Sequence, residues 1–270
     1  MKTILIPTDF SPASGNALFY GTQLAEILNA KVILFHAYRI PSPMPSINMG
    51  ISNYGVMTEV KQQVEDEAKR ILHEKSTDIE TVCEVGDPKA AIISMAKEKK
   101  ADMVIIGMKG AGKNLKKIFG STATALTSGI NIPVLIVPEA ATFQNPDVIA
   151  FATDNIECDL EEDLDQVKEI KDAFHSKVYV VHVIKNEDAE QLKFSEMSGP
   201  GIFSGVGFDF PVDENISHGL NAFILRKEVK MLVMMPHKQD WAEKLFKKSE
   251  TKDMIFHTHI PLLILPNMYL

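Results

Sequence analysis

The chain has 270 residues, of which 45% are hydrophobic and 24% are charged, a composition typical of soluble globular proteins. Its formal net charge is −8, and no long basic run offsets it, which argues against a nucleic-acid-binding surface. No stretch has the apolar length of a membrane span or a signal peptide, and two unrelated cysteines, Cys83 and Cys158, favour free thiols in a reducing cytoplasm over a disulfide.

Short apolar runs alternate with longer amphipathic segments along the first half of the chain. The apolar runs predict buried strands, and the segments with helical spacing predict helices. Residues 39–57 are rich in Pro, Ser, Gly and Met and predict a long loop. The predicted elements are, in chain order, strand Thr3–Pro7, helix Ser14–Leu28, strand Lys31–Tyr38, helix Thr58–Lys75, strand Glu80–Glu84, a helix from Pro88 to about Lys97, strand Asp102–Gly107, helix Ser121–Gly129 and strand Pro133–Val137.

The second half of the chain repeats the first. Ile132–Pro138 recurs as Ile260–Pro266, and Asp9 has its counterpart in Asp154. Strands are predicted at Asp147–Thr153, Tyr179–Val183 and Pro261–Leu265, with His182 near the position of His36. The second copy is shorter around Glu187–Gly205, and Glu139–Pro146 forms the linker.

A repeat of this length indicates a duplicated domain rather than a solenoid. We therefore expect two domains, residues 1–143 and 144–270. Strands that alternate with helices and are apolar throughout predict parallel sheets covered on both faces. The expected fold is α/β, with two tandem doubly wound, Rossmann-like sheets of five parallel strands each.

Three glycines at and after the end of the fourth predicted strand form the candidate ligand-binding loop. Gly107, Gly110 and Gly120 precede the helix that begins at Ser121, at the sheet edge where doubly wound folds bind ligands. Backbone N–H groups of such a loop, together with a helix N-terminus, suit a phosphate chain. Glycine permits close backbone approach and positive φ there. Ser121 and Thr122 would add hydroxyl donors, and Lys109 or Lys113 would offset the phosphate charge.

The second copy has lost these glycines. Its equivalent positions hold Met235, Lys238 and Lys248, whereas Ser121 keeps its type as Ser249. The side chains obstruct backbone approach to a phosphate, although the two lysines remain as mobile point charges. This asymmetry predicts one working site and one supporting domain.

A P-loop is the alternative interpretation of the first glycines. Residues 107–113 satisfy the G-x-x-x-x-G-K part of that motif, and they follow a strand. The next residue is Asn114, so the hydroxyl that binds Mg²⁺ is missing. The helix also begins later, at Gly120-Ser121, which disfavours a P-loop.

The spacing Gly107-x2-Gly110-x9-Gly120-Ser121, preceded by Pro7-Thr8-Asp9 and followed by Ile132–Pro138, resembles the universal stress protein family. The resemblance covers nearly the whole chain, in the form of a tandem protein with two such domains. It implies a fold like the adenine nucleotide alpha hydrolases and binding of ATP or a related adenine nucleotide, with or without Mg²⁺.

Site residues follow from the same resemblance. It places Pro7, Thr8, Asp9 and Ala37 on the ribose and adenine side, with Ala37 at the end of the second strand beside the base. It also implies pairing of the two domains through their last strands, or a homodimer. The residues expected around ribose and phosphates are Gly107, Met108, Lys109, Gly110, Gly120, Ser121 and Thr122.

Three functions remain open at this point: a regulator that responds to an adenine nucleotide, a slow ATPase or nucleotidyl-transfer enzyme, and a scaffold that binds no nucleotide. The enzyme lacks an evident general base or arginine finger near the loop, and the glycine set argues against the scaffold. We expect no membrane or nucleic-acid partner.

Several single features also have simpler interpretations. Asp9 would serve as a turn or helix cap, and the glycines as loop residues. The Met-rich loop, with Met44, Met49 and Met57, is either adaptable packing or a lid over the nucleotide. Histidines at 218, 237, 257 and 259 lack metal-site spacing, and the acidic run at 161–163 predicts a helix start.

Overall fold

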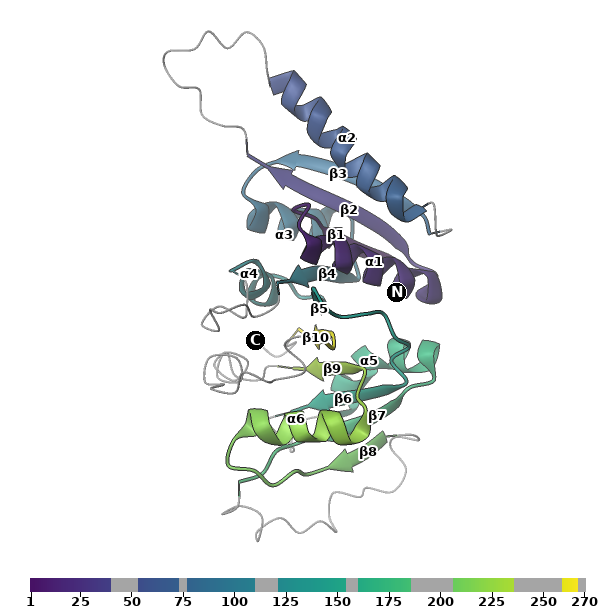
Figure 1. Ribbon diagram of the computed structural model, residues 1–270, viewed down its shortest axis with the longest axis vertical. Coiled ribbons are helices and arrows are strands. Elements are labelled where there is room, and N and C mark those ends of the chain that lie inside the picture. The colour runs from purple at the N-terminus through teal and green to yellow at the C-terminus, as the bar shows by residue number, and fades with distance from the viewer. Residues whose placement is uncertain are drawn as a thin grey trace.

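The structure is a computed structural model that describes residues 1–39, 53–72, 77–109, 121–153, 160–185, 206–235 and 259–266. These residues form one sheet of ten strands with helices on both faces (Figure 1). The strand order is β3-β2-β1-β4-β5-β10-β9-β6-β7-β8, so each half of the chain supplies one run of five neighbouring strands. The α/β fold predicted from the sequence is thereby confirmed.

The strands of the first half are almost wholly apolar because helices cover both of their faces. Ile4, Leu5 and Ile6 have no exposed surface. Ser11 caps the first helix, and Pro12 occupies its first turn. The elements are β1 (Thr3–Pro7), α1 (Pro12–Leu28), β2 (Lys31–Tyr38), α2 (Asn53–Leu72), β3 (Ile79–Val85), α3 (Pro88–Glu98), β4 (Met103–Met108), α4 (Ser121–Gly129) and β5 (Val134–Pro138).

The described part of the second half repeats the strand order of the first half and some of its polar contacts. His36 Nδ1 donates to the carbonyl oxygen of Thr8 at 2.8 Å, and His182 Nδ1 donates to that of Thr153 at 2.9 Å. The same hydrogen bond between the ends of two adjacent strands therefore recurs in the second half. The elements are β6 (Val148–Ala152), α5 (Leu160–Phe174), β7 (Lys177–Val181), β8 (Val206–Asp209), α6 (Ile216–Lys227), β9 (Met231–Met234) and β10 (Leu262–Ile264).

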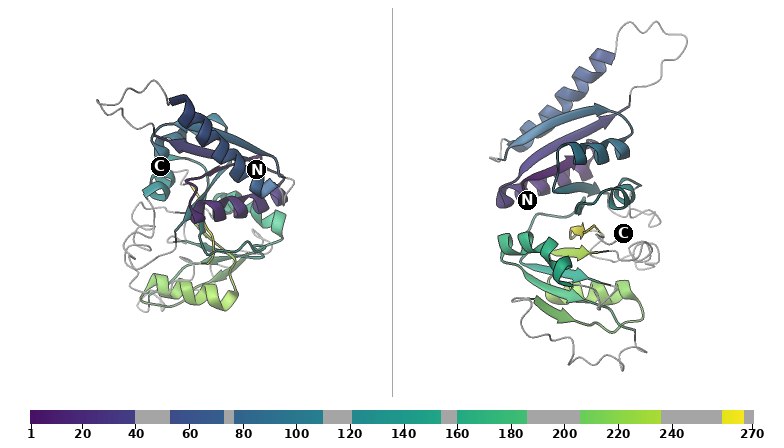
Figure 2. Two further views of the ribbon diagram at one scale, coloured as in Figure 1. Left: turned by 45° about the horizontal axis from the view of Figure 1, so that its top comes forward. Right: turned by 180° about the vertical axis from the view of Figure 1, so that it is seen from behind.

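Two hydrophobic cores lie on opposite faces of the sheet. Helices α1, α2 and α5 cover one face, and α3, α4 and α6 cover the other (Figure 2). Each core contains residues from both halves: Leu5 and Leu232 share one, whereas Ile4 and Val233 share the other. The two halves are thus packed through continuous cores as well as through the sheet.

The halves join where β5 meets β10. These strands pair antiparallel, with Leu135 opposite Leu263, whereas the other strand pairs are parallel. Pairing through the last strands of the two copies is confirmed, and it turns the two expected sheets into one. The division into domains at residues 143 and 144 stays a prediction.

Some predicted boundaries were wrong. Helix α2 begins at Asn53, inside the predicted loop of 39–57. Val56, Val60 and Val64 recur there at helical spacing, which favours the helix. The prediction was wrong because Gly55 and Met57 resemble the composition of the preceding loop. The second-half strand predicted at Tyr179–Val183 is β7, which starts earlier because Lys177 pairs with Val148. The shortened region around 187–205, residues 40–52 of the Met-rich loop and the glycine loop from 110 to 120 lie outside the described residues.

Candidate functional site

A cavity of about 420 Å³ lies at the carboxyl ends of β1 and β4. The chain runs from β1 to β2 and β3 on one side of β1, and then crosses from β3 to β4 on the other side. Such a reversal in a doubly wound sheet opens a crevice at the carboxyl edge, where ligands bind. The cavity volume falls in the range of about 300–1,000 Å³ that is usual for small-molecule sites.

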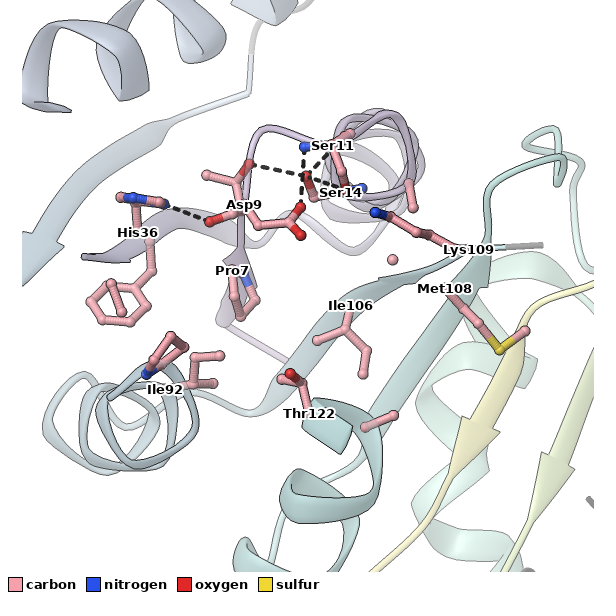
Figure 3. Close-up of a pocket in the computed structure, with 17 residues that line it drawn as sticks. Pro7, Asp9, Ser11, Ser14, His36, Ile92, Ile106, Met108, Lys109 and Thr122 are labelled. Carbon is pink, nitrogen blue, oxygen red and sulfur yellow. Dashed lines mark hydrogen bonds between the residues drawn. The ribbon is translucent and has the colours of Figure 1, made fainter. Parts of the chain in front are cut away.

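The cavity brings together residues that the sequence singles out from four separate segments. Figure 3 shows them converging from the end of β1, the end of β2, the end of β4 and the start of α4. Gly110 and Gly120, and the side chain of Ser121, lie outside the described residues. The predicted residues that line the cavity are Pro7, Thr8, Asp9, Ala37, Gly107, Met108, Lys109 and Thr122.

Asp9 lies in the turn between β1 and α1 and is not the cap of the helix. Its Oδ1 accepts a hydrogen bond from the backbone N–H of Ser11 at 3.1 Å, and Ser11 itself caps α1. Burial raises the pKa of Asp9, but the side-chain and backbone bonds from Ser11, a bond from Ser14 and the charge of Lys109 bring it below its ordinary value. Asp9 is therefore a carboxylate at neutral pH.

Gly107 lines the cavity and is needed for packing. A Cβ atom at this position would lie 2.2 Å from the carbonyl oxygen of Ala13 and 2.7 Å from the backbone nitrogen of Ser14. The first turn of α1 therefore rests directly on the backbone of β4, and only glycine leaves room for it. The expectation of positive φ is not met at Gly107; close backbone contact is the reason for this glycine.

The cavity has a polar wall and an apolar wall. Asp9, Ser11, Ser14 and Lys109 lie on one side, and Ile92, Ile106 and Thr122 lie toward the other (Figure 3). The start of α4 also faces the cavity, because Thr122 and Ala123 belong to its first turn. The unpaired N–H groups of a helix N-terminus attract anions.

Sequence patterns missed part of this lining. Ser11 is the N-cap of α1, Ser14 lies in the first turn of α1, Ile92 lies in the second turn of α3, and Ile106 belongs to β4. Ser11 followed by Pro12 is a helix-start pattern that would have placed Ser11 beside Asp9. For Ile92 and Ile106 no local pattern separates a cavity wall from an ordinary core position.

The second half carries larger side chains at two of the equivalent positions. Val183 takes the place of Ala37 and packs against the core of the α6 face, where a Cβ atom on Gly219 of α6 would lie 2.8 Å from its Cγ1. Met235 takes the place of Gly107, is 1% exposed and belongs to the core on the opposite face. Lys238 and Lys248, the other two replacements, lie outside the described residues.

Other candidate chemistry finds no support in the described part of the chain. That part holds no group of three or more His, Cys, Asp or Glu residues that could bind a metal ion. His218 contacts Asp213, and His237 and His257 lie outside it. Cys83 is a free thiol whose pKa is raised by burial. No described helix is both long enough and apolar enough to span a membrane.

Comparison with known proteins gives both a family and a fold. The sequence model described as "Universal stress protein family" matches residues 1–138. A universal stress protein of Methanocaldococcus jannaschii is 27% identical over 139 residues, which are 50% of this chain and 81% of that protein. The second half lies beyond these matches.

Solved structures extend the likeness to the whole chain. A universal stress protein from Archaeoglobus fulgidus has a TM-score of 0.66 at 16% identity and covers 98% of each chain, which shows a shared fold. A universal stress protein in complex with cAMP is 27% identical and covers 50% of this chain and 96% of its own, with a TM-score of 0.38. The family model matches residues 1–138, which contain all the strands and helices from β1 to β5. The chain therefore belongs to the universal stress protein family.

Proposed function

We propose that this protein binds one adenine nucleotide, ATP or a close relative, in the cavity of its first half, and that it acts as a nucleotide-responsive regulator in a stress response. The cavity at the switch point between β1 and β4 carries this proposal, because it gathers Asp9, Ala37, Gly107, Lys109 and Thr122 around one space.

The lining suits both ends of a nucleotide. Ile92, Ile106 and Ala37 offer apolar contact to a flat base, and Asp9 is an ionised acceptor for ribose hydroxyls. Lys109 on the polar wall and the N-terminus of α4 on the opposite wall would neutralise phosphates that lie between them. A Mg²⁺ ion would be held chiefly through the phosphates and water, as is usual for this ion.

The second half is proposed to support the first rather than to bind a second nucleotide. Val183 and Met235 carry larger side chains where the first half has Ala37 and Gly107, and both side chains pack against the cores. With residues 1–143 and 144–270 as its two domains, the chain would be an intramolecular pair. Nucleotide binding would shift its conformational equilibrium only so far as the two states differ in affinity for the nucleotide.

Isothermal titration calorimetry with adenosine, AMP, cAMP and ATP tests the proposal. We expect one nucleotide per chain, and about tenfold weaker binding in Ala37→Val, which introduces the side chain of the second half. Val183→Ala is the matched control and should leave the affinity unchanged. Lys109→Ala should weaken ATP more than adenosine, since adenosine has no phosphate.

The outcomes separate the three functions. No binding at millimolar nucleotide would overturn the proposal and favour a scaffold. Release of inorganic phosphate by the wild type, with the nucleotide concentration for half-maximal release raised in Ala37→Val in step with its weaker binding, would add slow ATPase activity at this site. Equal weakening of ATP and adenosine by Lys109→Ala would contradict the assignment of that lysine to the phosphates.

A further inference from the structure

A buried carboxylate lies behind the polar wall of the cavity. Glu67 belongs to α2, and its side chain is only 8% exposed. Its neighbours on the helix, Val64 and Ala68, pack into the core of the α1, α2 and α5 face. Arg70 is the nearest cation, at 4.0 Å. Burying a carboxylate is costly unless hydrogen bonds satisfy it, so the contacts that Glu67 makes require an explanation.

Glu67 reaches the end of β1 and receives a hydrogen bond there. The hydroxyl of Thr8 donates to Glu67 Oε2 at 2.9 Å, and both side chains are buried. Thr8 Oγ1 also accepts from the backbone N–H of Phe10 at 3.0 Å and lies 3.2 Å from Ser14 Oγ. A hydroxyl has a single proton. With that proton directed at Glu67, the oxygen lone pairs remain available to Phe10.

Phe10 needs this support because its backbone is strained. It has φ of 60°, the left-handed region that L-residues with side chains seldom adopt. The turn it forms presents Asp9 to the cavity, with Asp9 Oδ1 held by the N–H of Ser11. The chain of contacts thus runs from Glu67 through the Thr8 hydroxyl to the turn that carries Asp9.

We propose that Glu67 is a positioning residue for the cavity: its carboxylate fixes the Thr8 hydroxyl, and through it the turn that presents Asp9, so that docking of α2 and binding at the cavity are coupled. Glu67 itself is absent from the cavity lining. Arg70, His36 and Asp9 are the other charged or titratable groups that face it. The inference deepens the proposed function and rests on it for the ligand.

A purely structural role is the alternative, in which Glu67 only helps α2 to pack. Ile71 provides the matched comparison, because it is buried on α2 at 8% exposure in the same core and its aliphatic side chain cannot accept the Thr8 proton. Ile71→Val should lower the melting temperature without disturbing the turn. Glu67→Gln should rescue most of the wild-type behaviour, since its amide oxygen can still accept the Thr8 proton.

Two measurements on the full chain test the inference. Without nucleotide, NMR-detected hydrogen exchange reports on the amides of Phe10 and Ser11; with ATP, calorimetry gives the affinity. We expect Glu67→Ala to accelerate exchange at both amides about tenfold and to weaken ATP binding by a similar factor. In a Thr8→Val background the further effect of Glu67→Ala should nearly vanish, because the coupled partner is already gone.

The inference is overturned if Glu67→Ala changes exchange and affinity no more than Ile71→Val does, or if its effects persist undiminished beside Thr8→Val. If the proposed function itself is wrong, the wild type binds no ATP, which distinguishes that case from failure of this inference. The exchange rates alone then decide whether Glu67 holds the turn.

Discussion

At the scale of single residues, Gly107 links the core to the cavity. Its backbone contacts the backbone of Ala13 and Ser14 in the first turn of α1, and it lines the cavity as well. Backbone atoms cannot move aside as a flexible side chain does, so a methyl group here must displace α1 or β4. The same residue therefore has to satisfy packing and ligand approach.

Gly107→Ala should lower the free energy of unfolding by at least about 2 kcal/mol, because its Cβ atom would lie 2.2 Å from the carbonyl oxygen of Ala13. Guanidinium denaturation measures the change. Gly55→Ala in α2 is the control: nothing lies within 4 Å of its Cβ position, and alanine should raise stability by about 0.5–1 kcal/mol. Equal effects of the two changes would contradict this account of Gly107.

Glu67 gives the chain a pH dependence of known sign. Burial, offset in part by the Thr8 hydrogen bond and the charge of Arg70, raises the pKa of Glu67 above its ordinary value of 4.5. The native state then keeps this proton to higher pH than the unfolded chain, so stability falls as pH rises from the unfolded pKa through the folded pKa. The glutamine of Glu67→Gln does not titrate, so the variant lacks this contribution to the pH dependence.

The free energy of unfolding of Glu67→Gln, relative to wild type, should therefore increase between about pH 4 and pH 7. Urea denaturation at a series of pH values measures it. Glu65→Gln, at a half-exposed position on the same helix, controls for the loss of one negative charge. A difference from wild type that stays constant or falls with pH would show that Glu67 is not destabilised as a carboxylate.

At the scale of the elements, β5 and β10 form the joint of the sheet. Three residue pairs connect them, and Leu135 lies opposite Leu263 with both side chains fully buried. The resemblance to the universal stress protein family implies this pairing, because it pairs the two domains through their last strands. Directly opposed residues in an antiparallel pair interact through their side chains, so Leu135 and Leu263 should be energetically coupled.

Leu135→Ala and Leu263→Ala should each cost about 2–5 kcal/mol, and the double variant should cost less than their sum by about 0.5–3 kcal/mol. Denaturant unfolding of the single and double variants measures the coupling. Leu5→Ala with Leu263→Ala is the control, since these residues belong to opposite cores and should be additive. Additive losses of stability in Leu135→Ala and Leu263→Ala would show that these two side chains do not couple β5 to β10.

Most of the fold follows from the sequence because its strands are continuous apolar runs with clear breaks, as at Thr3–Pro7 and Lys31–Tyr38. Asp9 and Gly107 could be predicted as cavity residues because both lie at the carboxyl ends of predicted strands. Ile92, Ser14 and Glu67 were not, because they reach the site from helices whose docking depends on distant contacts. No local pattern encodes the hydrogen bond between Thr8 and Glu67, which are far apart in the chain.

At the scale of the whole molecule, the two halves share cores, a sheet and side-chain contacts. Asn16 of α1 donates to the carbonyl oxygens of Pro138 at 2.8 Å and Ala141 at 2.9 Å, just before the second half begins. Tyr20 contacts Phe143 edge to face at the end of the first half. The N-terminal amine of Met1 pairs across the halves with Glu169 of α5, and both cores continue from one half into the other. The halves should therefore unfold together.

Asn16→Ala should lower stability by about 1–3 kcal/mol, because two carbonyl groups lose their donor. Hydrogen exchange of the amides of Val104 in the first half and Val233 in the second measures whether both lose the same free energy. Gln62→Ala, on the exposed side of α2, is the control and should change neither. A loss confined to Val104 would show that the halves unfold independently.

A crystal structure grown with ATP tests the central claim most directly. The account predicts one nucleotide per chain, with its base beside Ala37, its ribose at Asp9 and its phosphates between Gly107 and Thr122, while the space at Val183 and Met235 holds none. Nucleotide bound in the second half, or bound in the first half away from the cavity between β1 and β4, would contradict it.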